Sequence, residues 1–337
     1  MSTSIAGIEY VLPERVETLE DLRRENPDWP VDELGASLGI RSRHLAGPEE
    51  TSSDLGFAAA SRLLERDELP RAEIDFLIAC SQTPDYFLPA NACLLQHRLG
   101  LSREVGTLDL SMGCSGFVMA LFTAKALVES GQARNVLLVI ADTITKVVHP
   151  RDRSLRPLFG DAGAAALVRA GDGPGGLGAF VLGTNGAQAS RLVVPAGGFR
   201  LRPSPATAQA AVDADGCVRS QENMFMDGTA IFTFAITVVP RALKQLYAKT
   251  GLGPEQVDAF VFHQANAFML KELAKRCGIP ENKLVVSLED VGNTSSVSIP
   301  IALQRQVKAG RIRPGMRVVL AGFGVGLSWA VCELIWG

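Results

Sequence analysis

The residue best suited to covalent chemistry in this sequence is Cys114. The segment 108–110 is typical of a strand end, and a strongly apolar helix is predicted to begin just after Cys114. Backbone N–H groups and the dipole at a helix start stabilise an anion, so we expect a lowered pKa for the Cys114 thiol and a thiolate available as nucleophile. The small neighbours Gly113 and Ser115 would let a substrate carbonyl approach the backbone. The alternative is a cysteine that only packs at a strand–helix corner.

Two polar side chains in the second half of the chain could assist this nucleophile. His263 follows an apolar strand in Val-Phe-His-Gln-Ala-Asn, and Asn293 lies at a predicted helix start in Gly-Asn-Thr-Ser-Ser-Val. Taken alone, His263 also fits a hydrogen-bonded core residue. Asn293 alone also fits a helix N-cap, for which Asn is among the preferred residues. With Cys114 they make the Cys-His-Asn set of a nucleophilic catalyst.

A glycine-rich turn, Gly-Phe-Gly-Val-Gly-Leu-Ser-Trp at 322–329, follows another apolar strand near the carboxy terminus. Its spacing differs from that of a dinucleotide-binding fingerprint, and too few residues follow it to build a βαβ unit. A tight turn that presents a backbone N–H fits better. Beside the amide of Cys114, such a donor would complete an oxyanion hole.

Internal similarity explains how residues so far apart in the sequence could meet. Three pairs of segments repeat at nearly constant offsets: 74–82 with 257–265, 113–118 with 292–297, and 135–140 with 317–322. In this alignment Asn293 is equivalent to Cys114, and His263 to Cys80. If two copies of one unit pack about a pseudo-twofold axis, their strand ends point into one central cavity.

The elements that must position these residues are predicted to form an α/β fold of two halves, residues 1–170 with the nucleophile and 171–337 with His and Asn. Short apolar runs predict strands at 75–80, 135–140, 258–262 and 317–321. Their unbroken apolar character favours sheets that are covered on both faces. The boundary between the halves falls at the glycine-rich stretch 169–176. Residues 195–227 lack clear periodicity and indicate an insertion that caps or borders the site.

Composition excludes several other classes of protein. The chain has 337 residues, 47% of them hydrophobic, which excludes disorder and small disulfide-stapled scaffolds. A net charge of −3 gives no electrostatic footprint for nucleic acid or an anionic membrane. Neither a signal peptide nor a membrane-spanning run is visible, so we expect a soluble, cytoplasmic protein. None of the six cysteines has metal-ligand spacing, so no metal site is predicted.

Five motifs, taken together, carry a resemblance to a known family. They are Gly-Cys-Ser-Gly-Phe at 113–117, His-Gln-Ala-Asn at 263–266, Gly-Asn-Thr-Ser at 292–295, Phe-Gly-Asp-Ala-Gly-Ala at 159–164 and the final glycine-rich turn. In these motifs, and nearly from end to end, the chain resembles the β-ketoacyl-acyl-carrier-protein synthase III family of the thiolase superfamily. The resemblance implies a five-layered αβαβα fold built from two duplicated halves, usually as a homodimer.

The resemblance also implies a reaction. The family carries its triad at the positions of Cys114, His263 and Asn293, and the thiolate takes an acyl group from acyl-CoA or an acyl carrier protein. A malonyl thioester then enters, and His and Asn hydrogen-bond its carbonyl and stabilise the enolate formed as carbon dioxide leaves. The carbanion attacks the acyl-Cys carbonyl, whose oxygen would be held by the backbone amides of Cys114 and Val325. A neutral His263 is required, which an apolar cavity favours. No cofactor is implied, since CoA or phosphopantetheine thioesters are the substrates.

Further residues match family positions along the path of the substrates. Trp29 resembles the tryptophan that stacks on the CoA adenine, and Arg153 an arginine that helps hold the nucleotide. Phe87 matches a position at which the partner subunit limits the acyl pocket. Asn266 and Phe268 are expected to line the substrate passage.

The sequence departs from typical housekeeping members of the family in three places. Those members carry an arginine where this chain has Phe268, the spacing from Trp29 to Gly39 is longer here, and 195–218 looks inserted. All three places concern the entrance or the pocket. The acyl chain, the choice between CoA and carrier protein, and the pathway therefore stay open, a specialised pathway being as consistent as the start of fatty acid synthesis.

Three alternatives fit parts of the sequence. A thiolase-fold acyltransferase that makes an ester or amide without decarboxylation would keep Cys114 and His263 but need not depend on Asn293. A papain-type Cys-His-Asn hydrolase agrees with the chain order, but the duplication and the position of Asn293 do not suit it. A non-catalytic partner subunit would not require the intact triad.

Overall fold

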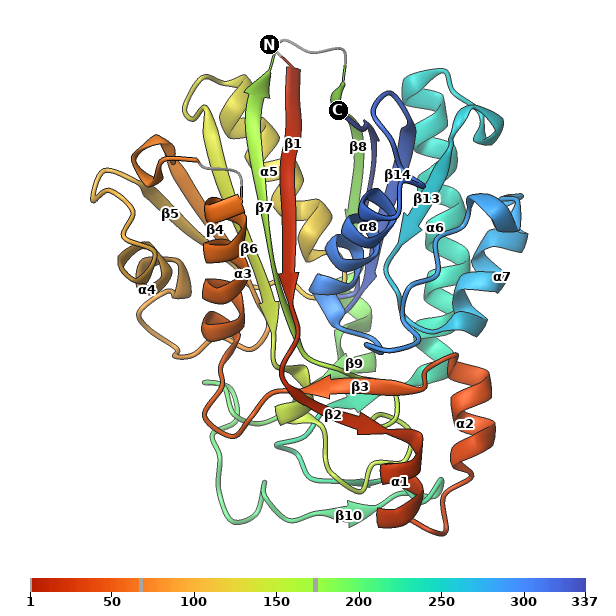
Figure 1. Cartoon of the computed structure of the whole chain (residues 1–337). Coiled ribbons are helices and arrows are strands. Elements are labelled where there is room, and N and C mark those ends of the chain that lie inside the picture. Colours follow the sequence, from red (N-terminus) through yellow and green to blue (C-terminus); the bar gives the residue numbers. More distant parts are fainter. Residues whose placement is uncertain (1, 67–68, 172–174) are drawn as a thin grey trace.

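Two β-sheets, one from each half of the chain, lie side by side in the computed structural model, which describes residues 2–66, 69–171 and 175–337 (Figure 1). The first sheet has five strands in the order β1-β7-β6-β4-β5 and the second has four in the order β13-β14-β15-β8. The first consists of β1 (Ser2–Val11), β4 (Phe76–Cys80), β5 (Gly106–Leu110), β6 (Asn135–Asp142) and β7 (Ala162–Gly171). The second consists of β8 (Gly176–Thr184), β13 (Ala259–Phe262), β14 (Arg317–Gly324) and β15 (Ser328–Ile335).

The four strands of the second sheet repeat the connectivity of β4, β6, β7 and β1 in the first, which agrees with the predicted duplication. β4 pairs in parallel with β6, and β13 pairs in parallel with β14. The next strands are antiparallel in both sheets: β6, β7 and β1 in the first, and β14, β15 and β8 in the second. The four predicted strands are present as β4, β6, β13 and β14. The chain passes from β7 to β8 at the predicted boundary, whose central residues 172–174 lie outside the described part of the chain.

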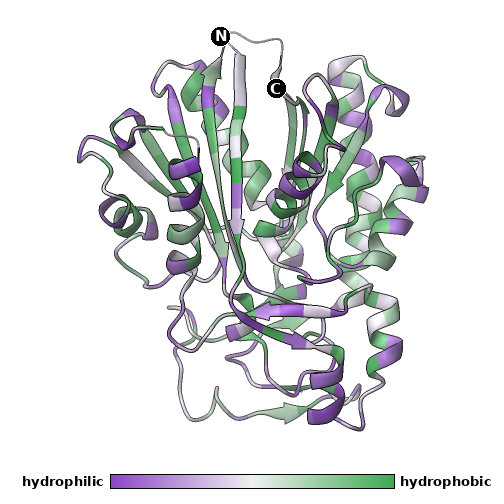
Figure 2. Cartoon of the chain, viewed as in Figure 1, coloured by the Kyte–Doolittle hydropathy of each residue, from purple (hydrophilic) through white to green (hydrophobic). Residues whose placement is uncertain are grey.

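Helices complete five layers, as expected for an αβαβα arrangement. The outer face of the first sheet is covered by α3 (Ser52–Arg66) and α4 (Asn91–Arg98), and that of the second by α6 (Gly228–Thr250) and α7 (Ala267–Cys277). Between the sheets lie α5 (Gly116–Glu129) and α8 (Ser298–Lys308), each in contact with both sheets. Figure 2 shows the hydrophobic residues concentrated on the strands and on the helix sides that face them. Burial against a sheet on each side explains why α5 is apolar almost throughout.

The remaining elements gather at one end of the molecule (Figure 1). They are β2 (Arg15–Thr18), α1 (Leu19–Glu25), α2 (Val31–Leu38), β3 (Ser42–Leu45), β9 (Leu192–Val193), β10 (Ala211–Val212), β11 (Val218–Arg219) and β12 (Phe225–Met226). Six short 3-10 helices, at 71–73, 144–147, 186–191, 254–256, 281–283 and 295–297, complete the described structure. The predicted insertion, residues 195–227, therefore folds as irregular chain with short paired strands.

A buried ion pair attaches this end layer to the sheets. Arg43 in β3 is 2% exposed, pairs with Glu17 in β2 and donates to the carbonyl oxygen of Phe159 at 3.1 Å. Phe159 in turn forms an isolated β-bridge with Asn293. Arg43 thus supports the backbone that holds a predicted catalytic residue.

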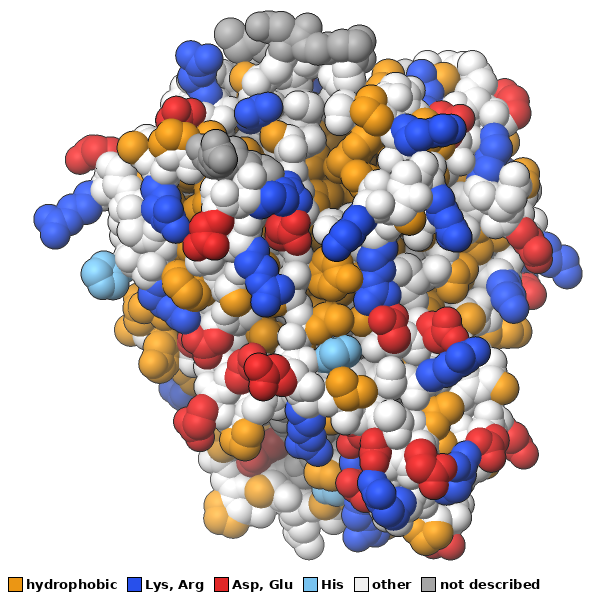
Figure 3. Space-filling model, in the orientation of Figure 1, with side chains coloured by type: hydrophobic (Ala, Val, Ile, Leu, Met, Phe, Trp, Pro, Cys, Tyr) orange, Lys and Arg blue, Asp and Glu red, His pale blue; other side chains and the backbone are white. Residues whose placement is uncertain are grey.

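The surface carries charges of both signs. On the face shown in Figure 3, basic and acidic side chains are intermixed. Within the described ranges, no helix combines the length and the apolar character needed to cross a bilayer.

Candidate active site

Cys114 lies in the turn between β5 and α5, two residues before the helix begins, as predicted. The side chain is buried, at 7% exposed, and it lines two separate cavities. The final glycine-rich turn lies directly against it: a Cβ added to Gly324 would be 2.5 Å from the Cys114 sulfur. Glycine is therefore required for the turn to approach the nucleophile this closely.

One cavity, of about 320 Å³, brings the predicted triad together. Cys114, His263 and Asn293 all line it, although they come from the ends of different elements in the two halves. Asn266 and Phe268, predicted to line the substrate passage, line the same cavity. The Asn266 side chain also caps α7, because its Oδ1 accepts the Met269 N–H at 2.8 Å.

Three hydrogen-bonding groups near the sulfur of Cys114 act to lower the pKa of its thiol. They are the backbone N–H of Val325, the N–H of Cys114 itself and the hydroxyl of Ser295. The two predicted oxyanion-hole amides therefore converge on the sulfur. Burial nevertheless raises the pKa of the Cys114 thiol to about 11, and the Asp142 carboxylate adds to this rise. The prediction of a lowered thiol pKa is wrong, because desolvation outweighs the donors and the helix dipole.

His263 is an uncharged imidazole in this site. It is 2% exposed and meets the Phe323 ring edge-on with centroids 5.7 Å apart. Burial lowers the pKa of His263 to about 4, against a hydrogen bond to the Ser295 backbone that raises it. Its Nδ1 lies 2.8 Å from the hydroxyl oxygen of Ser298, which leaves Nε2 available to a ligand.

Asn293 is fixed by its main chain and its side chain. Its N–H donates to the Leu158 carbonyl at 2.9 Å, and its carbonyl accepts the Gly160 N–H at 3.1 Å. The side-chain Oδ1 accepts the Ser295 N–H at 3.0 Å. The amide NH₂ group is thus the part of Asn293 left to donate into the cavity.

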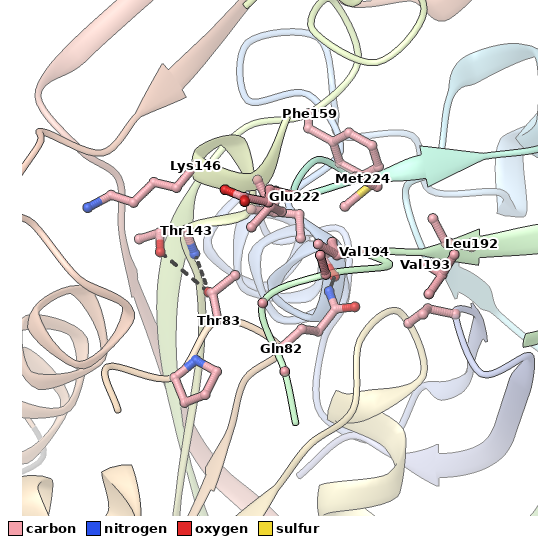
Figure 4. Close-up of a pocket in the computed structure, with 18 of the residues that line it drawn as sticks. Gln82, Thr83, Thr143, Lys146, Phe159, Leu192, Val193, Val194, Glu222 and Met224 are labelled. Carbon is pink, nitrogen blue, oxygen red and sulfur yellow. Dashed lines mark hydrogen bonds between the residues drawn. The ribbon is translucent and has the colours of Figure 1, made fainter. Parts of the chain in front are cut away.

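A second cavity, of about 800 Å³, is also lined by Cys114. Figure 4 shows part of its lining. Several residues between Leu192 and Met224 form part of its wall, so the stretch interpreted as an insertion borders this cavity. Gln82 and Thr83, which follow β4, form the opposite side. Phe87 lines this cavity of its own subunit. Its side chain is 67% exposed, and its ring centroid lies 5.2 Å from that of Phe199.

A third cavity, of about 500 Å³, lies next to the triad cavity. Arg153 and Pro30 line it, and Trp29, which is half-buried, directly precedes Pro30 in the chain. This cavity shares Met226, Gly228 and Thr229 with the triad cavity. Arg153, predicted to help hold a nucleotide, therefore lines a cavity that shares part of its wall with the triad cavity, and Trp29 directly precedes another residue of its wall.

Several residues of the site were not predicted. Asp142, at the end of β6, is fully buried, and burial raises the pKa of its carboxyl to about 6. It accepts the Gln82 N–H at 2.8 Å and bonds Ser296 from the other half. Gln82 and Ser295 occur within the repeated segments and motifs, which was the available signal, but their contacts depend on how the halves pack.

Family models match both halves of the chain. The model described as "3-Oxoacyl-[acyl-carrier-protein (ACP)] synthase III" matches residues 108–186, and the model of its C-terminal part matches residues 247–336. The predicted insertion lies between the two matched ranges. A β-ketoacyl-[acyl-carrier-protein] synthase III from Caldanaerobacter subterraneus subsp. tengcongensis is 34% identical over 100% of this chain and 98% of that protein.

Solved structures agree with this relationship. A 3-oxoacyl-(acyl-carrier-protein) synthase III is 45% identical, with a TM-score of 0.97 and full coverage of both chains. The corresponding synthase from Burkholderia xenovorans LB400 is 36% identical, with a TM-score of 0.92 over 100% of this chain and 95% of that one. The priming β-ketosynthase of the R1128 polyketide pathway is 32% identical, with a TM-score of 0.85 over 99% and 96% of the two chains. The chain therefore belongs to the 3-oxoacyl-[acyl-carrier-protein] synthase III family of thiolase-fold enzymes and is a condensing acyltransferase.

Proposed function

We propose that Cys114, His263 and Asn293 catalyse a condensation in two stages. An acyl group first passes from an acyl-CoA or acyl carrier protein to the Cys114 sulfur. A malonyl thioester then loses carbon dioxide and attacks the acyl-enzyme to give a β-ketoacyl thioester. The observation that carries this proposal is that the three side chains line one buried cavity in which two backbone amides face the sulfur.

In the first stage, the Cys114 sulfur bonds to the acyl carbon and the bond to the departing thiol breaks. The thiol proton of Cys114 ends on that departing thiolate, so the number of protons balances. The carbonyl oxygen becomes negative in the tetrahedral intermediate and would be stabilised by the N–H groups of Cys114 and Val325. These donors are fixed by the fold and need no rearrangement during the reaction.

In the second stage, the malonyl carbon–carboxylate bond breaks and its electron pair forms an enolate. In the tautomer of His263 whose Nδ1 accepts from the Ser298 hydroxyl, Nε2 carries the hydrogen; that N–H and the NH₂ of Asn293 would donate to the enolate oxygen. Burial keeps His263 neutral, so it retains one donor and one acceptor nitrogen. The enolate carbon attacks the acyl carbonyl, the bond from the acyl carbon to the Cys114 sulfur breaks, and the thiolate that leaves takes up a proton from solvent.

The acyl group carried by Cys114 is proposed to be larger than acetyl. The 800 Å³ cavity beside the sulfur has far more room than a two-carbon group needs, and much of its wall is apolar. Ile144, Leu192 and Met224 contribute to that wall. Similarity to a priming ketosynthase of a polyketide pathway supports a specialised acyl donor.

Phe268 lies at the entrance, where the resemblance to the family implies an arginine in typical housekeeping members. Phe268, which replaces an arginine there, is 54% exposed and stacks on Phe232 with ring centroids 5.5 Å apart. We therefore propose that donor binding relies on the opening formed by Arg153 and the Trp29 segment, where a CoA nucleotide or a carrier phosphopantetheine would enter.

We also propose a cytoplasmic homodimer. Tyr86, Phe87, Leu88 and Phe199 are all more than half exposed, and exposed apolar groups of this size mark interaction surfaces. The reaction requires a reduced Cys114, and all six cysteines are free thiols in the structure. Thiols stay reduced in the cytoplasm.

Intact-protein mass spectrometry tests the proposal. Wild type, Cys114→Ala and the matched control Cys93→Ala, an exposed cysteine, are incubated with acyl-CoAs from acetyl to dodecanoyl and with the same acyl groups on carrier protein. We expect an acyl adduct on wild type and Cys93→Ala only, which malonyl thioester then discharges with release of carbon dioxide. Discharge onto an amine or alcohol without carbon dioxide would indicate the non-decarboxylating acyltransferase instead. The absence of any Cys114 adduct would refute the proposed mechanism.

A further inference from the structure

The main chain of Asn293 is held between two residues of the first half of the chain. Its N–H donates to the Leu158 carbonyl oxygen at 2.9 Å, and its own carbonyl oxygen accepts the Gly160 N–H at 3.1 Å. Phe159, between these two residues, forms a parallel β-bridge with Asn293. The position from which the Asn293 amide reaches the triad cavity therefore depends on where residues 158–160 lie.

The guanidinium of Arg43 holds residues 158–160 in place. Its Nη1 donates to the Phe159 carbonyl oxygen at 3.1 Å and also bonds the Arg156 carbonyl oxygen. Arg43 comes from β3, is 2% exposed and is not among the described residues that line the three cavities. Since a residue in this position does not touch the substrates, any effect of Arg43 on the reaction must pass through the groups that it contacts.

The aliphatic part of Arg43 packs against the residue that precedes Asn293. Gly292 has a φ of +68°, and a Cβ added there would lie 2.8 Å from Arg43 Cγ and 2.8 Å from the Leu158 carbonyl oxygen. Both the backbone conformation and the short distances require glycine at this position. Arg43 thus contacts the surroundings of Asn293 twice, through the Phe159 carbonyl and through Gly292.

Glu17 sets the direction of the guanidinium. Its carboxylate is buried, pairs with Nη2 of Arg43 through one oxygen and accepts Nη2 of Arg156 at 2.7 Å through the other. The N–H groups of a guanidinium form a rigid planar fork, so a fixed partner at Nη2 also fixes the direction of Nη1. The ion pair therefore aims Nη1 of Arg43 at the Phe159 carbonyl.

The other two proposed catalytic residues are held by different contacts. Cys114 lies in the turn before α5, directly against Gly324. The main-chain N–H of His263 donates to the Ala321 carbonyl oxygen at 2.8 Å in the second sheet. The hydrogen bonds of Arg43 go to neither segment. A change at Arg43 should therefore displace Asn293 and leave the nucleophile in place.

We propose that Arg43 is a positioning residue for Asn293 that acts on the decarboxylation of the malonyl thioester and not on the acylation of Cys114. The proposal rests on the proposed function, in which the Asn293 amide donates to the enolate oxygen in the second stage only. Arg43 itself donates to main-chain carbonyls and to Glu17, and takes no part in the chemistry. A buried arginine of the end layer would in this way control one of the two stages.

Measuring the two stages separately tests the proposal. The first stage is followed by mass spectrometry of acyl transfer from acyl-CoAs to Cys114, and by iodoacetamide addition to the same sulfur, which needs no thioester. The second stage is followed by release of isotopic carbon dioxide from malonyl-CoA and from malonyl carrier protein. Wild type is compared with Arg43→Met and Arg43→Lys, at a temperature at which circular dichroism shows each variant folded. Asn293→Ala gives the rate without the amide.

Arg156→Met is the matched control. Arg156 is a second partner of Glu17 and also pairs with Glu25, but its side chain makes no hydrogen bond to residues 158–160. This variant therefore weakens the same ion cluster and leaves the contact from Arg43 to Phe159 in place.

We expect Asn293→Ala to slow carbon dioxide release by about 100-fold. Arg43→Met should slow it by about tenfold through kcat, with KM unchanged, because a small misplacement of a catalytic group already has a large effect on rate. Lysine keeps the charge but lacks the fork, so Arg43→Lys should be slower by about threefold. All of these variants should be acylated and alkylated at Cys114 at the wild-type rate, and Arg156→Met should match wild type in both stages.

A wild-type rate of carbon dioxide release in Arg43→Met beside a slow Asn293→Ala would overturn this proposal and leave the proposed function intact. Equal losses in both stages of Arg43→Met would also overturn it, because they indicate a purely structural role. A wild-type rate in Asn293→Ala would overturn the proposed function and this inference with it. If Arg43→Met fails to fold, Glu17→Gln decides the question, since it keeps Arg43 but removes the charge that orients the guanidinium.

Discussion

At the scale of single residues, burial leaves both Cys114 and His263 uncharged. Desolvation raises the thiol pKa to about 11 and lowers the imidazole pKa to about 4. A thiolate–imidazolium pair, as in papain-type hydrolases, requires the opposite order of the two pKa values. The structure therefore disfavours the hydrolase alternative and favours His263 as a neutral hydrogen-bond donor.

The neutral state of His263 gives a prediction about pH. The pKa of His263 in the folded protein lies below the ordinary value of 6.5, so the imidazole is uncharged throughout pH 6–8. Keeping this imidazole buried lowers the free energy of unfolding only at lower pH, where the unfolded chain binds a proton that the folded chain does not. Carbon dioxide release from a malonyl thioester should show no inflection near pH 6.5, and His263→Ala should slow it by about 100-fold. An inflection near 6.5 that vanishes in His263→Ala would contradict this assignment. Isotopic carbon dioxide release against pH provides the measurement.

At the scale of elements, short segments position the site by close approach. The turn that joins β14 to β15 reaches the Cys114 sulfur because Gly324 lacks a side chain. It is held there by Ser328, whose hydroxyl donates to the Val325 carbonyl at 2.9 Å and contacts Ser115 from the first half at 2.8 Å. The Val325 amide owes its position to these contacts.

A methyl group at position 324 should therefore stop acyl transfer. In Gly324→Ala, the added Cβ would lie 2.5 Å from the Cys114 sulfur, so either the turn or the nucleophile must move. We expect acyl-enzyme formation to fall by about 100-fold or more, since loss of one oxyanion donor alone has an effect of this size. Gly186→Ala, where the added Cβ meets nothing within 4 Å, is the control. Mass spectrometry measures the acylation of both variants. Equal acylation would show that the turn is not in contact with the sulfur.

The antiparallel pair of strands β2 and β3 depends on the buried Arg43–Glu17 ion pair. Removing one partner of a buried pair costs about 3–5 kcal/mol, so Arg43→Met should lower the free energy of unfolding by that amount in urea denaturation. Arg23→Met, which breaks exposed pairs, should cost less than about 1 kcal/mol. Burial raises the pKa of Glu17, but bonds from Arg156 and Arg43 outweigh it and the net pKa is lowered. This stabilisation is therefore present above pH 4.5 and lost as the pH falls below it. A small effect of Arg43→Met would contradict the burial of the pair.

At the scale of the whole molecule, the large cavity and an exposed apolar surface occur together. Leu88 is 79% exposed and Phe199 is 71% exposed, and both belong to segments that border the 800 Å³ cavity. A second copy of the chain that covers this surface would also close the cavity. The proposed dimer would in this way complete the acyl pocket.

Charge on this surface should separate the subunits. Phe199→Asp is expected to convert the protein from dimer to monomer at micromolar concentration, because a carboxylate would be buried without a partner. Val286→Asp, at an exposed apolar residue in the other half, should leave the mass unchanged. Light scattering after size-exclusion chromatography gives the two masses. A wild-type monomer, or a Phe199→Asp dimer, would remove this surface as the interface.

The sequence by itself determined the α/β fold class, the duplication, four strands and the candidate triad. These rest on local signals: apolar runs for β4, β6, β13 and β14, small residues around Cys114, and motifs that repeat in both halves. Because the repeat maps one half onto the other, it also indicated that Cys114 and Asn293 would meet. Local patterns of this kind can be recognised in a sequence without knowledge of its long-range contacts.

Only the tertiary structure decided the electrostatics and the contacts around the nucleophile. The sequence predicted a lowered thiol pKa from the helix start, but the degree of burial depends on how both halves and the final turn enclose Cys114, and that burial raises the pKa. The Gln82–Ser295 contact joins residues 213 positions apart, and the positive φ of Ser295 is set by its neighbours. Desolvation and side-chain geometry are properties of the packed molecule, which a linear pattern does not contain.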